Sequence, residues 1–145
     1  MATWKKAALW FFGTLIAIFV GCVALLICLS ADMCATKVID QVASPNGKLK
    51  AVLFQIDCGA TTDFNSHVAI VPGNVDTSQK GSLPKSFFVA DKNHGRAPAG
   101  NGEGPEIRLH WHAEDRLELR HHNLIRLVRA DVQSVGVTID YQTFR

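Results

Sequence analysis

Residues 44–58 read SPNGKLKAVLFQIDC and join a turn to the clearest strand pattern of the chain. Pro45 fixes the backbone at the entry of the turn, and Asn46-Gly47 suits the positive φ angles of a tight turn. A strand is predicted over residues 48–58, because its apolar side chains alternate along the chain. Val52, Phe54, Ile56 and Cys58 share one face, and Leu49, Ala51 and Leu53 begin the other. Apolar side chains on both faces are typical of a strand at the centre of a sheet.

Downstream of this strand, the sequence predicts five more short strands, separated by turns that contain Gly and Pro. They cover residues 67–71, 86–90, 105–112, 116–121 and 135–141. Residues 113–115 predict a tight hairpin, whereas residues 124–132 fit either one helical turn or an irregular segment. Short strands with almost no helical periodicity favour a mainly β fold, as a small antiparallel β-sandwich or open barrel.

Two long polar connections, residues 72–85 and 92–105, lie between the predicted strands. Connections of this length either bind a ligand or are mobile. The glycines of the second connection favour mobility there.

Before the β domain, residues 7–29 carry no charged side chain. As a helix this run is about 34 Å long, enough to cross a hydrocarbon core of roughly 30 Å. Lys5 and Lys6 precede it and Asp32 follows it, so the positive-inside rule predicts a cytoplasmic N-terminus. We therefore expect two parts: a cytoplasmic tip and transmembrane signal anchor over residues 1–31, and an extracytoplasmic β domain over residues 32–145.

Two other interpretations of the N-terminal segment compete with a retained anchor. A cleaved signal peptide is disfavoured, because the apolar run exceeds the usual 7–15 residues and lacks a clean A-x-A site. A lipoprotein is the other alternative, since residues 19–22, FVGC, resemble a lipobox and would make Cys22 the lipidated residue. The retained anchor is the favoured interpretation.

Four cysteines divide into two pairs by position. Cys22 and Cys28 lie in the apolar run, whereas Cys34 and Cys58 are the two cysteines of the outer part. An oxidising compartment favours a Cys34–Cys58 disulfide. Two free thiols, or a Cys34 that pairs with another chain, remain the alternatives.

Composition narrows the class of function. A chain of 145 residues with a formal net charge of +2 is too short for a multidomain enzyme and is not a strongly basic nucleic-acid binder. P-loop, GxGxxG, HExxH, GxSxG and CxxC motifs do not occur in the sequence. We therefore expect no enzymatic activity, no cofactor and no nucleic acid as partner.

Histidines and arginines alternate with apolar residues on two of the predicted strands. Arg108, His110 and His112 share one face, and Arg116 and Arg120 share the matching face of the next strand. Paired histidines can bind zinc, but the neighbouring arginines repel a cation, so no metal site is expected. The same surface could attract anionic lipid headgroups or an acidic partner, more strongly below pH 6.5, where imidazoles protonate.

Residues 57–63, DCGATTD, form the most distinctive loop of the sequence. Thr61, Thr62 and Asp63 can hydrogen-bond to their own backbone, and His67 follows. These residues predict a small polar surface for a partner, together with the Arg/His face. A hydrolase centred on this loop is an alternative, because threonine, histidine and aspartate are the residue types of a nucleophile, a base and an orienting group.

The order of these motifs resembles a family of small uncharacterised bacterial proteins, in which a membrane anchor or lipoprotein signal precedes a β domain with a SPDGK…CGATT core. The resemblance covers about residues 34–141, with Asn46 in place of the family's Asp. The matching segments are SPNGKLKAVLF (44–54), DCGATTDFNSHVAIVPG (57–73), FFVAD (87–91), IRLHW (107–111), DRLELR (115–120) and VTIDY (137–141).

The resemblance implies an extracytoplasmic β domain with Cys34 and Cys58 paired, and it implies no known activity. With the predicted N-terminal anchor, we expect the protein in the bacterial inner membrane with its β domain in the periplasm. Together these observations predict a non-enzymatic interaction module of the cell envelope with a protein partner. An immunity-type protein that binds a toxin and a small envelope hydrolase are the alternatives. A third is an accessory subunit whose membrane helix is the binding element.

Overall fold

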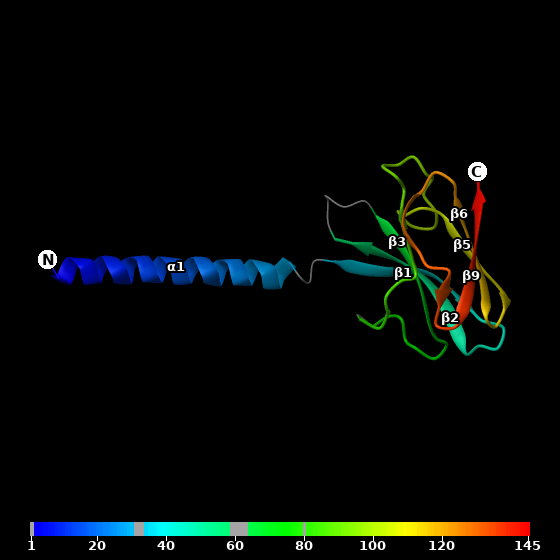
Figure 1. Ribbon diagram of the computed structural model, residues 1–145, viewed down its shortest axis with the longest axis horizontal. Helices are drawn as coiled ribbons and strands as arrows, with labels where there is room; N and C mark the ends of the chain where they lie inside the picture. The colour runs from blue at the N-terminus through cyan, green and yellow to red at the C-terminus, as the bar shows by residue number, and fades with distance from the viewer. Residues whose placement is uncertain (1, 31–33, 59–63, 80) are drawn as a thin grey trace. The chain divides into compact units, whose positions relative to one another are not determined.

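The computed structural model describes residues 2–30, 34–58, 64–79 and 81–145, and consists of one helix followed by a β domain (Figure 1). The chain divides into two compact units, residues 1–34 and 35–145. The predicted fold class, an N-terminal helix before a small mainly β domain, is confirmed.

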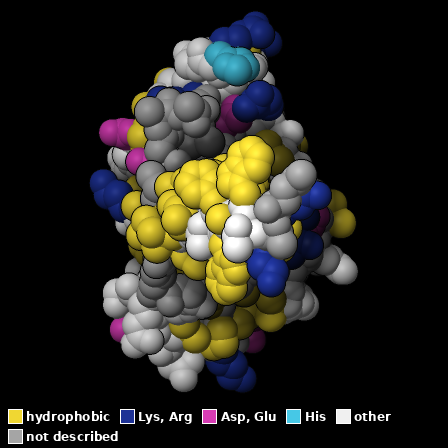
Figure 2. All heavy atoms as spheres, turned by 90° about the vertical axis from the view of Figure 1, so that its left-hand side faces the viewer, with side chains coloured by type: hydrophobic (Ala, Val, Ile, Leu, Met, Phe, Trp, Pro, Cys, Tyr) yellow, Lys and Arg dark blue, Asp and Glu magenta, His cyan; other side chains and the backbone are white. Residues whose placement is uncertain are grey.

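Helix α1 (Ala2–Ser30) is long and apolar enough to span a membrane. The qualifying stretch, Thr3–Leu29, has 27 residues, and its large apolar side chains are exposed. It is about 40 Å long at 1.5 Å per residue. Figure 2 shows its hydrophobic side chains gathered in yellow where the helix is seen end-on. Such a surface is stable only when apolar material surrounds it.

Within the described residues, nine strands form two sheets. The first sheet has the order β1-β2-β3-β4-β7, and all neighbouring strands in it are antiparallel. The second sheet has the order β5-β6-β9-β8. The strand bounds are β1 (Ala35–Ala43), β2 (Leu49–Asp57), β3 (Asn65–Pro72), β4 (Phe88–Asp91), β5 (Ile107–Ala113), β6 (Arg116–His122), β7 (Arg126–Ala130), β8 (Gln133–Ser134) and β9 (Val137–Phe144).

The predicted central strand is confirmed as β2, which pairs with β1 on one side and β3 on the other. Ala51 and Leu53 point into the main core between the two sheets, which also contains Phe88, Trp111 and Leu119. Its opposite face carries Val52 and Phe54 into a second, smaller core. The two faces are therefore buried in different cores, which explains why the strand is apolar on both.

Strand β1 was not predicted from the sequence. It pairs with β2 through the turn at residues 44–48, where Gly47 has φ 70° and its N–H donates to Ser44 O at 2.9 Å. The strand lies at the edge of the first sheet, most of its side chains are exposed, and its register shifts between Val38 and Asp40. An exposed edge strand with a bulge lacks the alternation that identifies a strand in a sequence.

The connection over residues 72–85 covers the outer face of the first sheet. Val75 and Leu83 pack on the smaller core, and Lys50 Nζ donates to Val75 O at 2.7 Å. The second connection also packs on the domain: Gln55 accepts a hydrogen bond from the Glu103 N–H at 3.3 Å. A Cβ atom at Gly104 would lie 2.3 Å from Ser66 Oγ, so this close approach requires glycine. Both connections thus cover buried surface.

Two features differ from the sequence prediction: the structure of residues 126–130 and the direction of β9 relative to β6. Residues 126–130, predicted as helical or irregular, form β7 at the edge of the first sheet. After β6 the chain crosses to the first sheet as β7. It then returns to the second sheet as β8, and the next strand, β9, pairs with β6 in parallel. The departure follows from this crossing of the chain between sheets, which no local pattern encodes.

Cys34 and Cys58 form a disulfide, as predicted. The pairing of Ala35 with Asp57 brings the open end of the β1–β2 hairpin together beside both cysteines. A bond there closes a loop of about 25 residues, and loop-closure entropy predicts a stabilisation of about 3 kcal/mol.

We expect the Cys34→Ser/Cys58→Ser double variant to lose about 3 kcal/mol of unfolding free energy. Urea unfolding of the full chain in detergent, followed by circular dichroism at β-sheet wavelengths, measures this. The oxidised and reduced parent proteins serve as controls. If reduction leaves the unfolding midpoint unchanged, the stabilising role of the bond is wrong.

Candidate functional site

The predicted Arg/His residues come together on the outer face of the second sheet. Arg108 pairs with Arg120, and His110 with Glu118, across β5 and β6. The alternate residues Ile107, Trp111 and Leu119 point into the core. Five predicted residues therefore share one exposed surface, formed with outward neighbours from β6 and β9. The members of this outer face are Glu106, Arg108, His110, His112, Arg116, Glu118, Arg120, His122, Thr138, Asp140, Gln142 and Phe144.

The expected excess of positive charge on this face is corrected by its carboxylates. Arg108 lies 2.6 Å from Glu106, Arg116 lies 3.1 Å from Asp140, and Arg120 lies 4.0 Å from Glu118. Three guanidinium groups thus meet three carboxylates. These pairs are partly exposed and contribute little stability, but they hold the long side chains in place. Only protonation of its histidines would give the face a net positive charge.

An aromatic group lies beside the charged residues. The Arg108 guanidinium lies 4.7 Å from the centre of the Phe144 ring, a cation–π distance. His112 Nε2 lies 3.1 Å from Glu118 Oε2, and the rings of His110 and His112 meet edge-on at 4.9 Å. The face therefore offers donors, acceptors and a flat apolar ring in a fixed arrangement.

His67 does not belong to this face. It lies on β3, on the opposite side of the sandwich, where its ring stacks on Phe54 at 5.3 Å. The hydroxyl within reach of His67 Nδ1 is that of Ser86, at 3.1 Å. Thr61, Thr62 and Asp63, the other predicted members of the loop surface, lie outside the described residues. The hydrolase hypothesis therefore stays a prediction.

Burial lowers the pKa of His67 below the ordinary value of 6.5. The unfolded chain then binds a proton that the folded state does not, so this residue reduces stability as the pH falls below 6.5. We expect His67→Gln to weaken the loss of stability between pH 6.5 and 5 relative to the parent protein. Thermal unfolding at several pH values measures it, and identical pH profiles for both proteins would contradict the assignment.

Metal binding gains no support from the described residues, among which no group of three or more His, Cys, Asp or Glu side chains is placed to hold a metal ion. His121 is buried and packs on Phe88 inside the sandwich, whereas His122 packs edge-on against Phe144. The two neighbouring histidines therefore point to opposite faces, as a regular strand requires.

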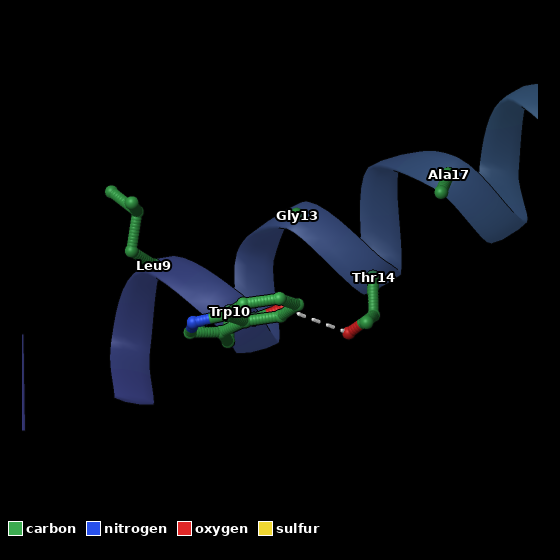
Figure 3. Close-up of a pocket in the computed structure, with 5 residues that line it drawn as sticks. All are labelled: Leu9, Trp10, Gly13, Thr14 and Ala17. Atoms are coloured by element: carbon green, nitrogen blue, oxygen red, sulfur yellow. Dashed lines mark hydrogen bonds between the residues drawn. The ribbon is translucent and has the colours of Figure 1, made fainter. Parts of the chain in front are cut away.

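Helix α1 has a shallow hollow on one side, lined by Leu9, Trp10, Gly13, Thr14 and Ala17 (Figure 3). Thr14 Oγ1 donates to Trp10 O at 3.1 Å, so its hydroxyl is satisfied within the helix. Small residues allow close approach of a second helix, but lipid tails can fill the same space. Cys22, the candidate lipidation residue, is an exposed free cysteine inside this helix.

Sequence reasoning missed one exposed surface of the β domain. In the described part of residues 34–145, the large apolar side chains that are exposed all lie between residues 124 and 135. The sequence signal of this surface was the group of apolar residues in segment 124–132, whose periodicity fitted either one helical turn or an irregular segment. We call this set the apolar strip; its members are Leu124, Leu127, Val128, Val132 and Val135.

Comparison with known proteins gives no matching family model, no matching curated protein and no matching solved structure.

Proposed function

We propose that this chain is a non-enzymatic interaction module, tethered by α1 to a membrane, whose β domain binds a protein partner through the outer face of the second sheet. In a bacterial cell this would place residues 34–145 in the periplasm. Lys5 and Lys6, on the N-terminal side of the apolar run, support that orientation.

The proposal rests on one difference between the two sheets, which is whether the outer face is covered. The outer face of the first sheet is covered by the connection that contains Val75 and Leu83. The outer face of the second sheet instead carries exposed side chains that form ion pairs, with Arg108, Arg116 and Arg120 each about half exposed. Exposed polar groups that are already held in position lose less entropy on binding.

The chemistry of this face suggests its partner. Because arginines and carboxylates balance in charge, a partner with both acidic and basic groups fits better than a purely acidic one. Arginine and aromatic side chains are also the residue types enriched at binding hot spots. Arg108 beside Phe144 is therefore the expected centre of the contact.

Site-specific photocrosslinking of the full chain in its native membranes tests the proposal. A photoreactive residue replaces His110 on the outer face, and a matched control replaces Gln79, which is exposed on the covering connection of the first sheet. We expect a discrete crosslinked protein from position 110 and none from position 79. Arg108→Glu in the position-110 protein should abolish that product without lowering the thermal midpoint of the domain. Equal products from both positions would overturn the proposal.

A further inference from the structure

The apolar strip follows one long edge of the β sandwich. Leu127 and Val128 lie on β7, the edge strand of the first sheet, and Val132 lies in the link to β8. Val135 occupies the β8–β9 turn at the edge of the second sheet. Its members are between 40% and 68% exposed. β7 and β8 are edge strands of the two sheets, and the other members of the strip lie in the chain just before, between and just after them.

Val135 has a backbone that its side chain disfavours. Ser134 pairs with Val137, so Val135 and Gly136 form a two-residue turn, and their φ angles are 52° and 76°. Two positive φ angles are those of a type I′ turn, where Asn or Gly is preferred. A β-branched residue there is strained. Since Val135 is 64% exposed, internal packing does not compensate for the strain, and an external apolar contact would.

Several features of the strip fit lipid better than another protein. The register between β4 and β7 shifts so that Val128 is an extra, bulged residue in β7. Arg126 and Arg129 lie on either side of it. Bulges and charges on an edge strand oppose the addition of another strand. The apolar members are all Leu and Val, residue types that are under-represented at protein hot spots. Aliphatic side chains beside arginines are suited to a headgroup boundary.

We propose that the apolar strip rests on the surface of the bilayer that α1 spans, with its aliphatic side chains in the interfacial region. This inference rests on the membrane tether of the proposed function. Ser30 and Cys34 are four positions apart in the sequence, at most about 14 Å of extended chain. So short a connection keeps the domain at the membrane, where the high effective concentration lets weak surface contacts persist.

The charges of the strip predict its lipid preference. Arg126 and Arg129 can meet phosphate groups, whereas the exposed Asp131 opposes anionic lipid. The net charge of these three side chains is only +1, and Arg126 is already paired with Asp91. Docking is therefore driven mainly by the apolar side chains, so it occurs on phosphatidylcholine and increases only modestly when phosphatidylglycerol is added.

Spin-label accessibility in the full chain, reconstituted into phosphatidylcholine vesicles, tests this contact. The background protein carries Cys22→Ala and Cys28→Ala, and a nitroxide is attached at Val132→Cys or, as a control, at Gln142→Cys on the exposed outer face of the second sheet. We expect the label at position 132 to meet dissolved oxygen more often than a water-soluble nickel chelate, and the label at position 142 to show the reverse. Equal exposure of both labels to the chelate would overturn the proposal.

A second variant separates docking from folding. Val135→Asn relaxes the strained turn, so it should raise the thermal midpoint in detergent. It also removes an aliphatic contact, so the ratio of docked to undocked protein reported by the position-132 label should fall by about tenfold. A higher midpoint with unchanged label accessibility would assign Val135 a structural role and refute its lipid contact.

The remaining outcomes distinguish this inference from the proposed function. Protection of the position-132 label from both oxygen and the chelate indicates a protein contact and refutes lipid docking, whereas crosslinking from position 110 can still succeed. Failure of the chain to integrate into vesicles at all overturns the tether and, with it, both proposals.

Discussion

Replacing Arg126 by Met is expected to lower the free energy of unfolding by about 3–5 kcal/mol. Arg126 Nε donates to Asp91 Oδ2 at 2.8 Å, and its Nη2 also contacts this oxygen. Asp91 is only 1% exposed, and its other oxygen accepts the Asn93 N–H at 2.8 Å. Without Arg126 a buried carboxylate lacks its counter-charge, which is among the largest losses a single substitution can cause.

Substitution of the other partner, Asp91, should lower the free energy of unfolding by less. Arg126 is about half exposed, so in Asp91→Asn its charge turns to water, and we expect a loss of about 1–2 kcal/mol from the weakened hydrogen bonds. Chemical unfolding of both single variants and of the double variant measures their coupling, and the double variant should be no less stable than Arg126→Met alone. The contrary result is that the two single substitutions lower the free energy of unfolding equally, with additive losses in the double variant. That result would show that the burial of Asp91 does not determine the stability effect of this ion pair.

The second large effect concerns Trp111, which connects the two sheets. It is 7% exposed within the main core, and its indole N–H donates to Val42 O on β1 at 2.9 Å. Trp111→Ala should lower the free energy of unfolding by about 3–5 kcal/mol, because it leaves a cavity between the sheets. Trp111→Phe keeps most of the packing but leaves the Val42 carbonyl without this donor, so we expect about 1–2 kcal/mol.

Circular dichroism measures both losses, with Trp4→Ala as the matched control. Trp4 is 81% exposed on α1, so its removal should leave the unfolding of the β domain unchanged. A Trp111→Phe variant as unstable as Trp111→Ala would mean that the hydrogen bond to Val42, rather than the packing, joins the sheets.

The sequence alone predicted those segments in which a single pattern, such as an uncharged run or apolar alternation, extends over the whole segment. The uncharged run at residues 7–29 predicted α1, because only a helix satisfies its backbone in lipid. Alternation predicted β5 and β6 with a tight hairpin between them, placed at residues 113–115, whereas in the structure β5 includes Ala113. Apolar residues on two faces predicted the central position of β2. The common outward direction of Arg108, His110 and His112 followed from the same period of two.

Tertiary structure decided what depends on residues distant in the sequence. The edge strand β1 exists because β2 offers it a partner, and β9 runs parallel to β6 because the intervening chain visits the other sheet. The net charge of the Arg/His face differs from the sequence prediction because Asp140, which comes from β9, lies beside Arg116. The apolar strip likewise became visible only when β7 and the β8–β9 turn were placed at one edge. Periodicity assigns a side chain to a face, but the partners of that face come from contacts whose register and topology no single segment contains.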